Sequence, residues 1–122
     1  MVVIDSNVFI NALRGNPSCI EFIVRNRGVG CFSALTEIEI LCGDICADRS
    51  EEARVRELLG QFRKVAVDNA VAVLAAKIER EHRPGLADAT IAATALLEGG
   101  VLATNNRRHF KGIARLSLLA VK

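Results

Sequence analysis

Three acidic residues in this sequence stand where chemistry is to be expected. Asp5 closes a short apolar run near the first residue, Glu39 lies in a stretch with helical spacing at 34–42, and Asp88 opens an alanine-rich helix expected over 87–97. Carboxylates that meet repel one another unless a cation neutralises them, and Mg²⁺ or Mn²⁺ prefers such oxygen ligands. If the three side chains share one edge of the fold, they suit metal-assisted attack on a phosphodiester.

Each of these acids also has a purely structural interpretation. Asp5 and Asp88 stand at the starts of expected helices, where a carboxylate can cap the free backbone amides. Thr36 and Glu39 have the spacing of a capping box. Glu37 points roughly 200° away from Glu39 around a helix, so only one of the two can face the core side. Both interpretations stay open for each acid alone, but their joint positions at strand ends and helix starts favour a shared site.

The elements that must position these acids alternate along the chain. Five short β-rich runs predict strands at Val2–Ile4, 29–32, 65–67, 101–103 and 116–121. Apolar residues with helical spacing lie between them, within 20–24, 35–42, 55–62, 71–78 and 91–96. Ser50 and Asp68 have the positions of helix N-caps. The strand runs are apolar without alternation, which is typical of a parallel sheet covered on both faces.

The predicted fold class is therefore α/β, a three-layer sandwich around a central, mostly parallel five-stranded sheet. Ligands of such sheets bind beyond the carboxyl ends of the strands, where Asp5 would lie. No repeat or linker interrupts the pattern, so residues 1–122 are expected to form a single domain.

Composition restricts the function less than the acids do. The 122 residues carry a net charge of +2, too balanced to indicate a nucleic-acid binder by itself. Trp and Tyr are absent and there are five Phe, so a base-stacking platform is not expected. The first residues lack a basic leader, and no apolar run is long enough to span a membrane, so a cytoplasmic protein is expected. The four cysteines lack a Cys-x-x-Cys motif and are expected to be reduced core residues.

Four segments together resemble the PIN domain, and most closely the VapC-type toxins of type II toxin–antitoxin systems. They are VIDSNVFI at 3–10, TEIEILCG at 36–43, DATIAATA at 88–95 and LATNNRRHF at 102–110. Each motif is weak alone, but their order and spacing extend the resemblance over essentially the whole chain. It implies a three-layer α/β fold, Mg²⁺- or Mn²⁺-dependent endoribonuclease activity and a cognate antitoxin that blocks the site.

The resemblance also assigns roles to residues. Asp5, Glu39 and Asp88 match the metal-binding acids, and Asn106 stands where many PIN domains carry a fourth catalytic acid. An amide carbonyl can still ligate a metal or orient water, but it brings no charge, so a second cation is expected to bind weakly. The residues expected to support the acids are Ser6, Asn7 and Thr104. Those expected to contact the RNA backbone are Arg14, Arg107, Arg108 and Lys111.

Other interpretations stay open at this point. A different metal-dependent phosphotransferase, such as a haloacid-dehalogenase-like phosphatase, would need a second Asp at the position of Asn7. A non-catalytic PIN scaffold that binds RNA or a protein partner is the second alternative, because the fourth acid is missing. His109 and His82 are expected to be ordinary exposed residues. A homodimer is expected, and the helices near 16–25 and 51–62 are candidate dimer or antitoxin surfaces.

Overall fold

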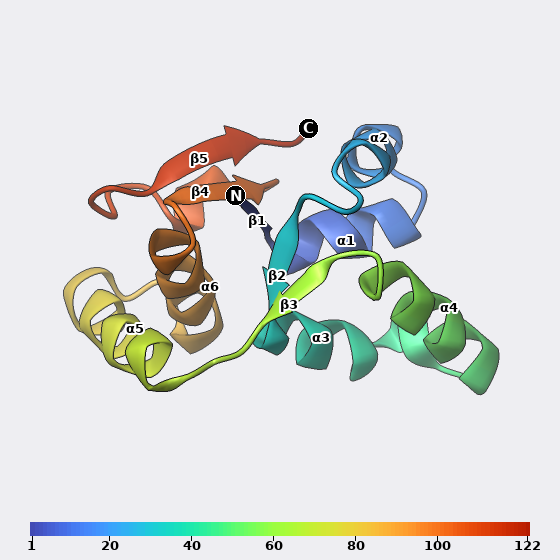
Figure 1. The fold of residues 1–122 in the computed structure, drawn as a ribbon, viewed down its shortest axis with the longest axis horizontal. Coiled ribbons are helices and arrows are strands. Elements are labelled where there is room, and N and C mark those ends of the chain that lie inside the picture. The colour runs from blue at the N-terminus through green and yellow to red at the C-terminus, as the bar shows by residue number, and fades with distance from the viewer.

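The computed structural model describes residues 1–122 and has a five-stranded sheet in the order β3-β2-β1-β4-β5 (Figure 1). Every neighbouring pair of strands is parallel. The strands are β1 Val2–Ile4, β2 Cys31–Ser33, β3 Arg63–Val65, β4 Val101–Thr104 and β5 Ser117–Ala120. The expected α/β class with a five-stranded parallel sheet is confirmed.

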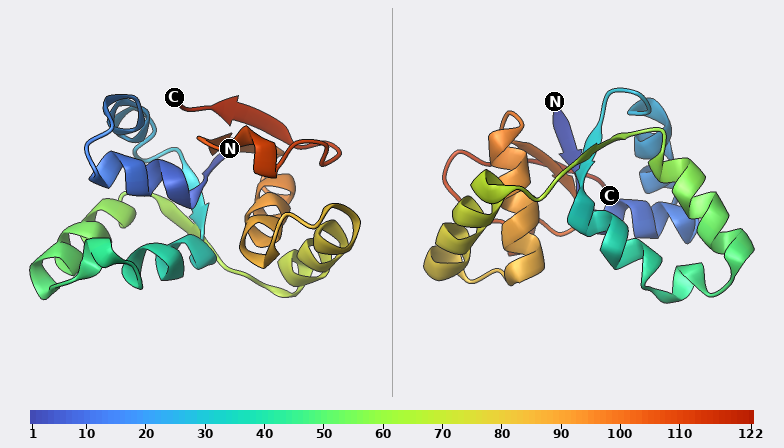
Figure 2. Two further views of the ribbon diagram at one scale, coloured as in Figure 1. Left: turned by 180° about the vertical axis from the view of Figure 1, so that it is seen from behind. Right: turned by 60° about the horizontal axis from the view of Figure 1, so that its bottom comes forward.

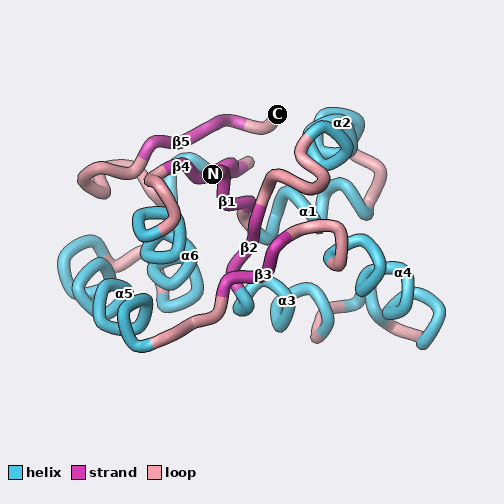
Figure 3. Tube along the Cα trace, viewed as in Figure 1, coloured by secondary structure: helices cyan, strands magenta, loops and turns pink.

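Helices cover both faces of the sheet, as Figure 2 shows from two further directions. One face is covered by α1 Ser6–Leu13, α2 Pro17–Arg25, α3 Ala34–Leu41 and α4 Arg49–Leu59. The other face is covered by α5 Asn69–His82 and α6 Leu86–Leu97. Two short 3-10 helices, η1 Asp44–Cys46 and η2 Arg107–His109, complete the chain. The links between these elements are short, and one or more helical segments separate each strand from the next along the chain (Figure 3).

Alternate residues of the central strands enter two separate cores. Val3 and Leu102 pack with α5 and α6, whereas Ile4 and Ala103 pack under the helices of the opposite face. This follows from the period of two in a strand, which sends successive side chains to opposite faces. Because both faces are buried, the strands need apolar residues at every position, which is why they show no polar alternation.

Two strands are displaced from their expected positions: β2 begins at Cys31 and not at Val29, which is 61% exposed, and the third strand lies two residues earlier than expected. The strand pairs at Arg63–Val65, and Val67 is 45% exposed in the link to α5. Apolar character alone pointed to 65–67, but β3 is an edge strand whose exposed positions are charged. Arg63 pairs with Glu98, and Lys64 donates to Glu37 at 2.9 Å. An edge strand needs only one covered side, so charged residues are tolerated there.

One of the two expected N-caps is wrong. Asp68 does cap α5, because its side chain accepts a hydrogen bond from the Val71 amide at 2.9 Å. For α4 the cap is Asp48, which accepts from the Glu51 amide at 2.9 Å, whereas Ser50 lies inside the helix and donates to Asp48. A carboxylate two residues earlier therefore takes the position assigned to Ser50.

All four cysteines are free thiols, but only two belong to the core. Cys19 and Cys31 are buried as expected. Cys42 is exposed at the end of α3, so the expectation of a core location is wrong for it. Cys46 is the last residue of η1 and is half-buried against the core. No helix of the structure is both long enough and apolar enough to cross a membrane.

Candidate functional site

The candidate site lies at the carboxyl ends of the three central strands. Asp5 follows β1, Ser33 ends β2 and starts α3, and Thr104 ends β4. These strands are adjacent in the order β2-β1-β4, so three chain segments far apart in sequence meet at one edge. Helix α3 brings Glu39 to this edge, and the first turn of α6 brings Asp88.

Asp5 is the most buried acid of the chain, with 3% of its surface exposed. The Thr104 hydroxyl donates to its Oδ2 at 2.8 Å. Burial raises the pKa of Asp5 to about 6, the Thr104 hydrogen bond and the adjacent Ser6 amide oppose that rise, and the negative charges of Asp88 and Glu39 add to it. The Asp5 side chain does not cap α1, so the structural interpretation is wrong here.

Glu39 is held by a residue from the opposite side of the site. The Ser6 hydroxyl donates to Glu39 Oε1 at 2.6 Å and lies 2.9 Å from the Thr36 hydroxyl. The expected capping box is therefore wrong: Thr36 is fully buried against Ser6, and Ser33 caps α3 instead. Glu37 points away from Glu39 and binds Lys64, as the helical period predicts.

Asp88 binds His109, a residue expected to be an ordinary part of the surface. The His109 Nδ1 lies 2.9 Å from Asp88 Oδ2. Burial raises the pKa of Asp88, and the adjacent His109 lowers it. Gly85, at φ 106°, takes the N-cap position of α6, so the capping interpretation of Asp88 is wrong. Asn106, at the position where many PIN domains carry a fourth acid, also contacts His109: its Nδ2 lies 3.0 Å from His109 Nε2.

The three acids are close enough to affect one another without converging on a single point. The charges of both Asp88 and Glu39 raise the pKa of Asp5. No three side chains of the His, Cys, Asp or Glu types are placed to bind one ion together in this arrangement. The arrangement is therefore an electronegative centre around a buried carboxylate, with Glu39 and Asp88 each held by its own hydrogen-bonding partner.

The remaining predicted residues divide into two groups. Ser6 and Thr104 are buried and bind the acids directly. The backbone N–H of Asn106 donates a hydrogen bond to the Thr104 hydroxyl at 2.9 Å. Asn7 is exposed and makes no side-chain hydrogen bond to the site. Of the residues expected to contact RNA, Arg107, Arg108 and Lys111 are exposed in the segment after β4, and none of them is in an ion pair. Arg14 follows the far end of α1, roughly 13 Å from Asp5 along the helix, so this position does not bring it to the acids.

Sequence reasoning missed two residues that fix the segment after β4. The Asn11 Nδ2 donates to Asn105 Oδ1 at 3.0 Å, and Asn105 in turn donates to the Val121 carbonyl. These bonds tie α1 and the residue after β5 to the turn between Thr104 and Asn106. No local pattern pairs Asn11 with a residue 94 positions later, so only the tertiary structure could reveal this contact.

Thr104→Val is expected to destabilise the protein by about 1–3 kcal/mol, because the buried hydroxyl bonds both Asp5 and the Asn106 amide. The pKa of Asp5 should rise further, since the Thr104 hydrogen bond lowers it. Thr104→Ser keeps the hydroxyl and is the matched control. Urea denaturation of both variants measures the effect; equal stability of the two would contradict the assigned role.

Comparison with known proteins agrees with this architecture. The PIN domain model matches residues 2–116. A curated relative, Ribonuclease VapC10 of Mycobacterium tuberculosis, is 34% identical over 117 residues, covering 90% of this chain and 86% of the relative. The chain therefore belongs to the PIN-domain family, and its curated relative is of the VapC type.

Solved structures show the same fold at lower identity. A toxin–antitoxin complex from Klebsiella pneumoniae matches with a TM-score of 0.86 and 24% identity, over 100% of this chain and 98% of that one. A DNA-bound VapBC from Salmonella typhimurium matches with a TM-score of 0.86 and 23% identity, over 99% of this chain and 98% of that one. At such identities these structures bear on the fold alone.

Proposed function

We propose that this protein is a Mg²⁺- or Mn²⁺-dependent endoribonuclease and the toxin of a toxin–antitoxin pair. The observation that carries the proposal is the buried Asp5, whose pKa is raised to about 6 beside two further acids at the centre of the sheet edge. A fold that needed only structural polar groups would gain nothing from burying a carboxylate among like charges. The curated relative, named a ribonuclease, supports the choice of RNA as substrate.

The chemistry of the donor groups fits a hard divalent ion. Asp5, Glu39 and Asp88 offer only oxygen ligands and three negative charges, and the four cysteines take no part in the site. A bound divalent ion would neutralise charge that develops on the scissile phosphate and would polarise water for attack. Asn106 adds no charge, so we expect one firmly held ion in the free protein.

The chain's own residues hold the acids ready for this task. Thr104 fixes Asp5, and Ser6 fixes Glu39. His109 holds Asp88 near the rim. Whichever of Glu39 and Asp88 does not bind the ion directly could accept a proton from the attacking water. The exposed Arg107, Arg108 and Lys111 follow the site directly, and we assign them to contacts with RNA phosphates.

The competing functions fit the geometry less well. The second Asp that a haloacid-dehalogenase-like phosphatase would need is replaced by Asn7. This residue is also exposed and lies outside the hydrogen-bonded network of the acids. The non-catalytic scaffold is favoured by one observation, the binding of uncharged Asn106 to His109 where a fourth acid would stand. We also propose an antitoxin partner, because the curated relative is of the VapC type and a structure with the same fold is a toxin–antitoxin complex. The exposed Ile20 and Val24 of α2 offer an apolar surface for it. The homodimer stays a prediction.

Stability without divalent ions is expected to rise as the pH falls from 7 to 5. The ordinary pKa of Asp5 is 3.8 and its pKa in the folded protein is about 6. The folded protein therefore binds a proton that the unfolded chain does not, and the cost of ionising the buried acid disappears on acidification. Asp5 alone should increase the free energy of unfolding by about 1 kcal/mol between pH 7 and pH 5.

Mg²⁺ is expected to raise the melting temperature at pH 7 and to have little effect at pH 5, where protons compete for Asp5. Thermal melts in EDTA and in Mg²⁺ at both pH values measure the two effects. A larger Mg²⁺ effect at pH 5 than at pH 7 would contradict the assignment of Asp5 to the ion.

The direct test is cleavage of defined RNA by the purified chain, freed of any antitoxin. Transfer and ribosomal RNAs are incubated with Mg²⁺, with Mn²⁺ and with EDTA, and the products are mapped. We expect cleavage with either ion and none with EDTA. Ion-induced stabilisation without any cleavage would favour the scaffold, and cleavage unaffected by EDTA would reject the role of the ion.

A further inference from the structure

The two edges of the sheet differ in a way that the nuclease site does not require. At the β3 edge, Arg63 and Lys64 are exposed and form ion pairs with neighbouring segments. Charged residues on an edge strand discourage other chains from pairing with it. At the opposite edge, the run 116–121 contains no charged residue. The β5 edge therefore lacks the protection that the β3 edge has.

Backbone groups of β5 are free to bind another strand. The Ser117 amide donates to Gly100 and the Val121 amide donates to Thr104. Because bonding residues alternate along a parallel pair, Ser117, Leu119 and Val121 face β4, whereas Leu118 and Ala120 turn their N–H and C=O groups outward. Ala120 is exposed and Leu119 is 42% exposed. Figure 1 shows β5 as the last strand of the sheet, with no element beyond it.

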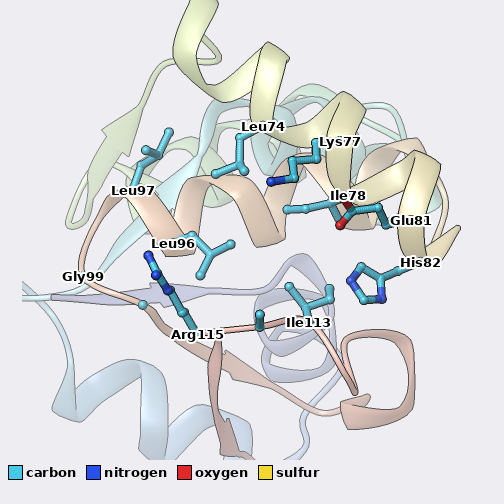
Figure 4. A pocket seen from close by; sticks show the side chains of 12 residues that line it. Leu74, Lys77, Ile78, Glu81, His82, Leu96, Leu97, Gly99, Ile113 and Arg115 are labelled. Atoms are coloured by element: carbon cyan, nitrogen blue, oxygen red, sulfur yellow. The ribbon is translucent and has the colours of Figure 1, made fainter.

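Hollows near both ends of this strand carry an excess of positive charge. A hollow of about 720 Å³ is lined by Arg115, which precedes β5, and by Lys77 against one acid, Glu81 (Figure 4). A second hollow of about 250 Å³ involves the opposite end of β5 and is lined by Arg25, Lys122 and one acid, Glu21. Arg25 pairs with Glu21 at 3.6 Å, so Lys122 supplies the excess positive charge there. An extended chain with apolar residues in its centre and acidic residues at its ends would complement this edge.

We propose that the β5 edge binds an extended segment of a protein partner as a sixth strand, with acidic residues of that segment at its two ends. A second copy of this chain fits less well, because antiparallel pairing of two β5 strands would bring Arg115 of each copy toward Lys122 of the other. The surface lies outside the acidic site, so this inference does not depend on the proposed nuclease activity.

The test uses the full chain and a synthetic peptide of alternating valine and threonine with aspartate and glutamate at its ends. A peptide with lysine at its ends is the matched control. We expect the acidic peptide to bind roughly tenfold more tightly in fluorescence anisotropy, and hydrogen exchange to slow at the Leu118 and Ala120 amides on binding.

Two variants separate strand pairing from charge. Ala120→Pro removes an outward N–H that has no partner in β4, a change that an edge strand tolerates, and should weaken binding roughly tenfold. Ala120→Val keeps the N–H and should bind normally. Lys122→Glu should weaken the binding of the acidic peptide without disturbing the fold, and circular dichroism verifies that the fold is unchanged.

Three results would overturn the proposal. They are equal binding of both peptides, unchanged exchange at Leu118 and Ala120, and concentration-dependent protection of these amides without peptide, which would assign the edge to a second copy. Displacement of the peptide by a single-stranded RNA oligonucleotide would assign the β5 edge to nucleic acid and would also reject the proposal.

Discussion

Asp5→Asn is expected to lower RNA cleavage at least about a thousandfold and, at the same time, to make the ion-free protein more stable at pH 7 by about 1–2 kcal/mol. The loss of cleavage follows because Asp5 is the central acid of the proposed site. The gain in stability follows because the fold no longer buries a negative charge at this position. Burial and the neighbouring acids raise the pKa of Asp5 to about 6, which shows that the folded protein disfavours this charge. Asparagine keeps a carbonyl that can accept the Thr104 hydrogen bond.

The combination distinguishes a catalytic acid from a structural one, because removal of a structural acid would lower both quantities. Cleavage of a defined RNA and urea denaturation in EDTA measure the two effects, and the stabilisation by Mg²⁺ should vanish in the variant. Asp44→Asn, at an exposed position of η1, is the matched control and should change neither. Wild-type cleavage by the Asp5 variant would remove this residue from the mechanism.

Phe9→Ala is expected to cost about 3–5 kcal/mol of stability, the largest loss predicted for one side chain. Phe9 is fully buried, and its ring lies edge-to-face against Phe32 at 5.8 Å and Phe62 at 5.4 Å. These three rings join α1 to β2 and to the residue before β3. Truncation therefore leaves a cavity and removes two aromatic pairs.

Urea denaturation in EDTA measures this loss. Phe9→Leu fills most of the space and should cost less than half as much. Phe22→Ala removes a ring of the same size from a half-buried position of α2 and should also cost less. A loss from Phe9→Ala no larger than that from Phe22→Ala would show that the cluster of Phe9, Phe32 and Phe62 does not stabilise the fold as described.

The central strands were predictable because burial on both faces leaves a simple signature. The runs at β1, β2 and β4 are apolar at nearly every position. The edge strand β5 was also found, because its run is apolar although most of its residues are exposed. The other edge strand, β3, was misplaced because two of its three residues, Arg63 and Lys64, are charged. They form ion pairs with distant segments, which no local apolar pattern reveals.

The acids of the candidate site were predictable from their positions, but their partners were not. Asp5 follows β1 and Asp88 lies in the first turn of α6, whereas Glu39 lies further along α3, the helix that follows β2. Parallel topology sends such positions to one edge. Ser6 was expected only to assist, and its hydroxyl in fact links Glu39 and Thr36. The contact of His109 with Asp88 depends on the path of the loop after β4, which composition does not encode locally.

The sequence by itself determined the fold class and the identities of the candidate acids, because apolar periodicity and residue type are local properties. The tertiary structure decided which helix starts are capped, how deeply Asp5 is buried and which edge of the sheet stays open. These depend on contacts between segments far apart in the chain, such as Thr104 with Asp5 across 99 positions. Desolvation, which raises the pKa of Asp5, exists only once those segments have packed around it.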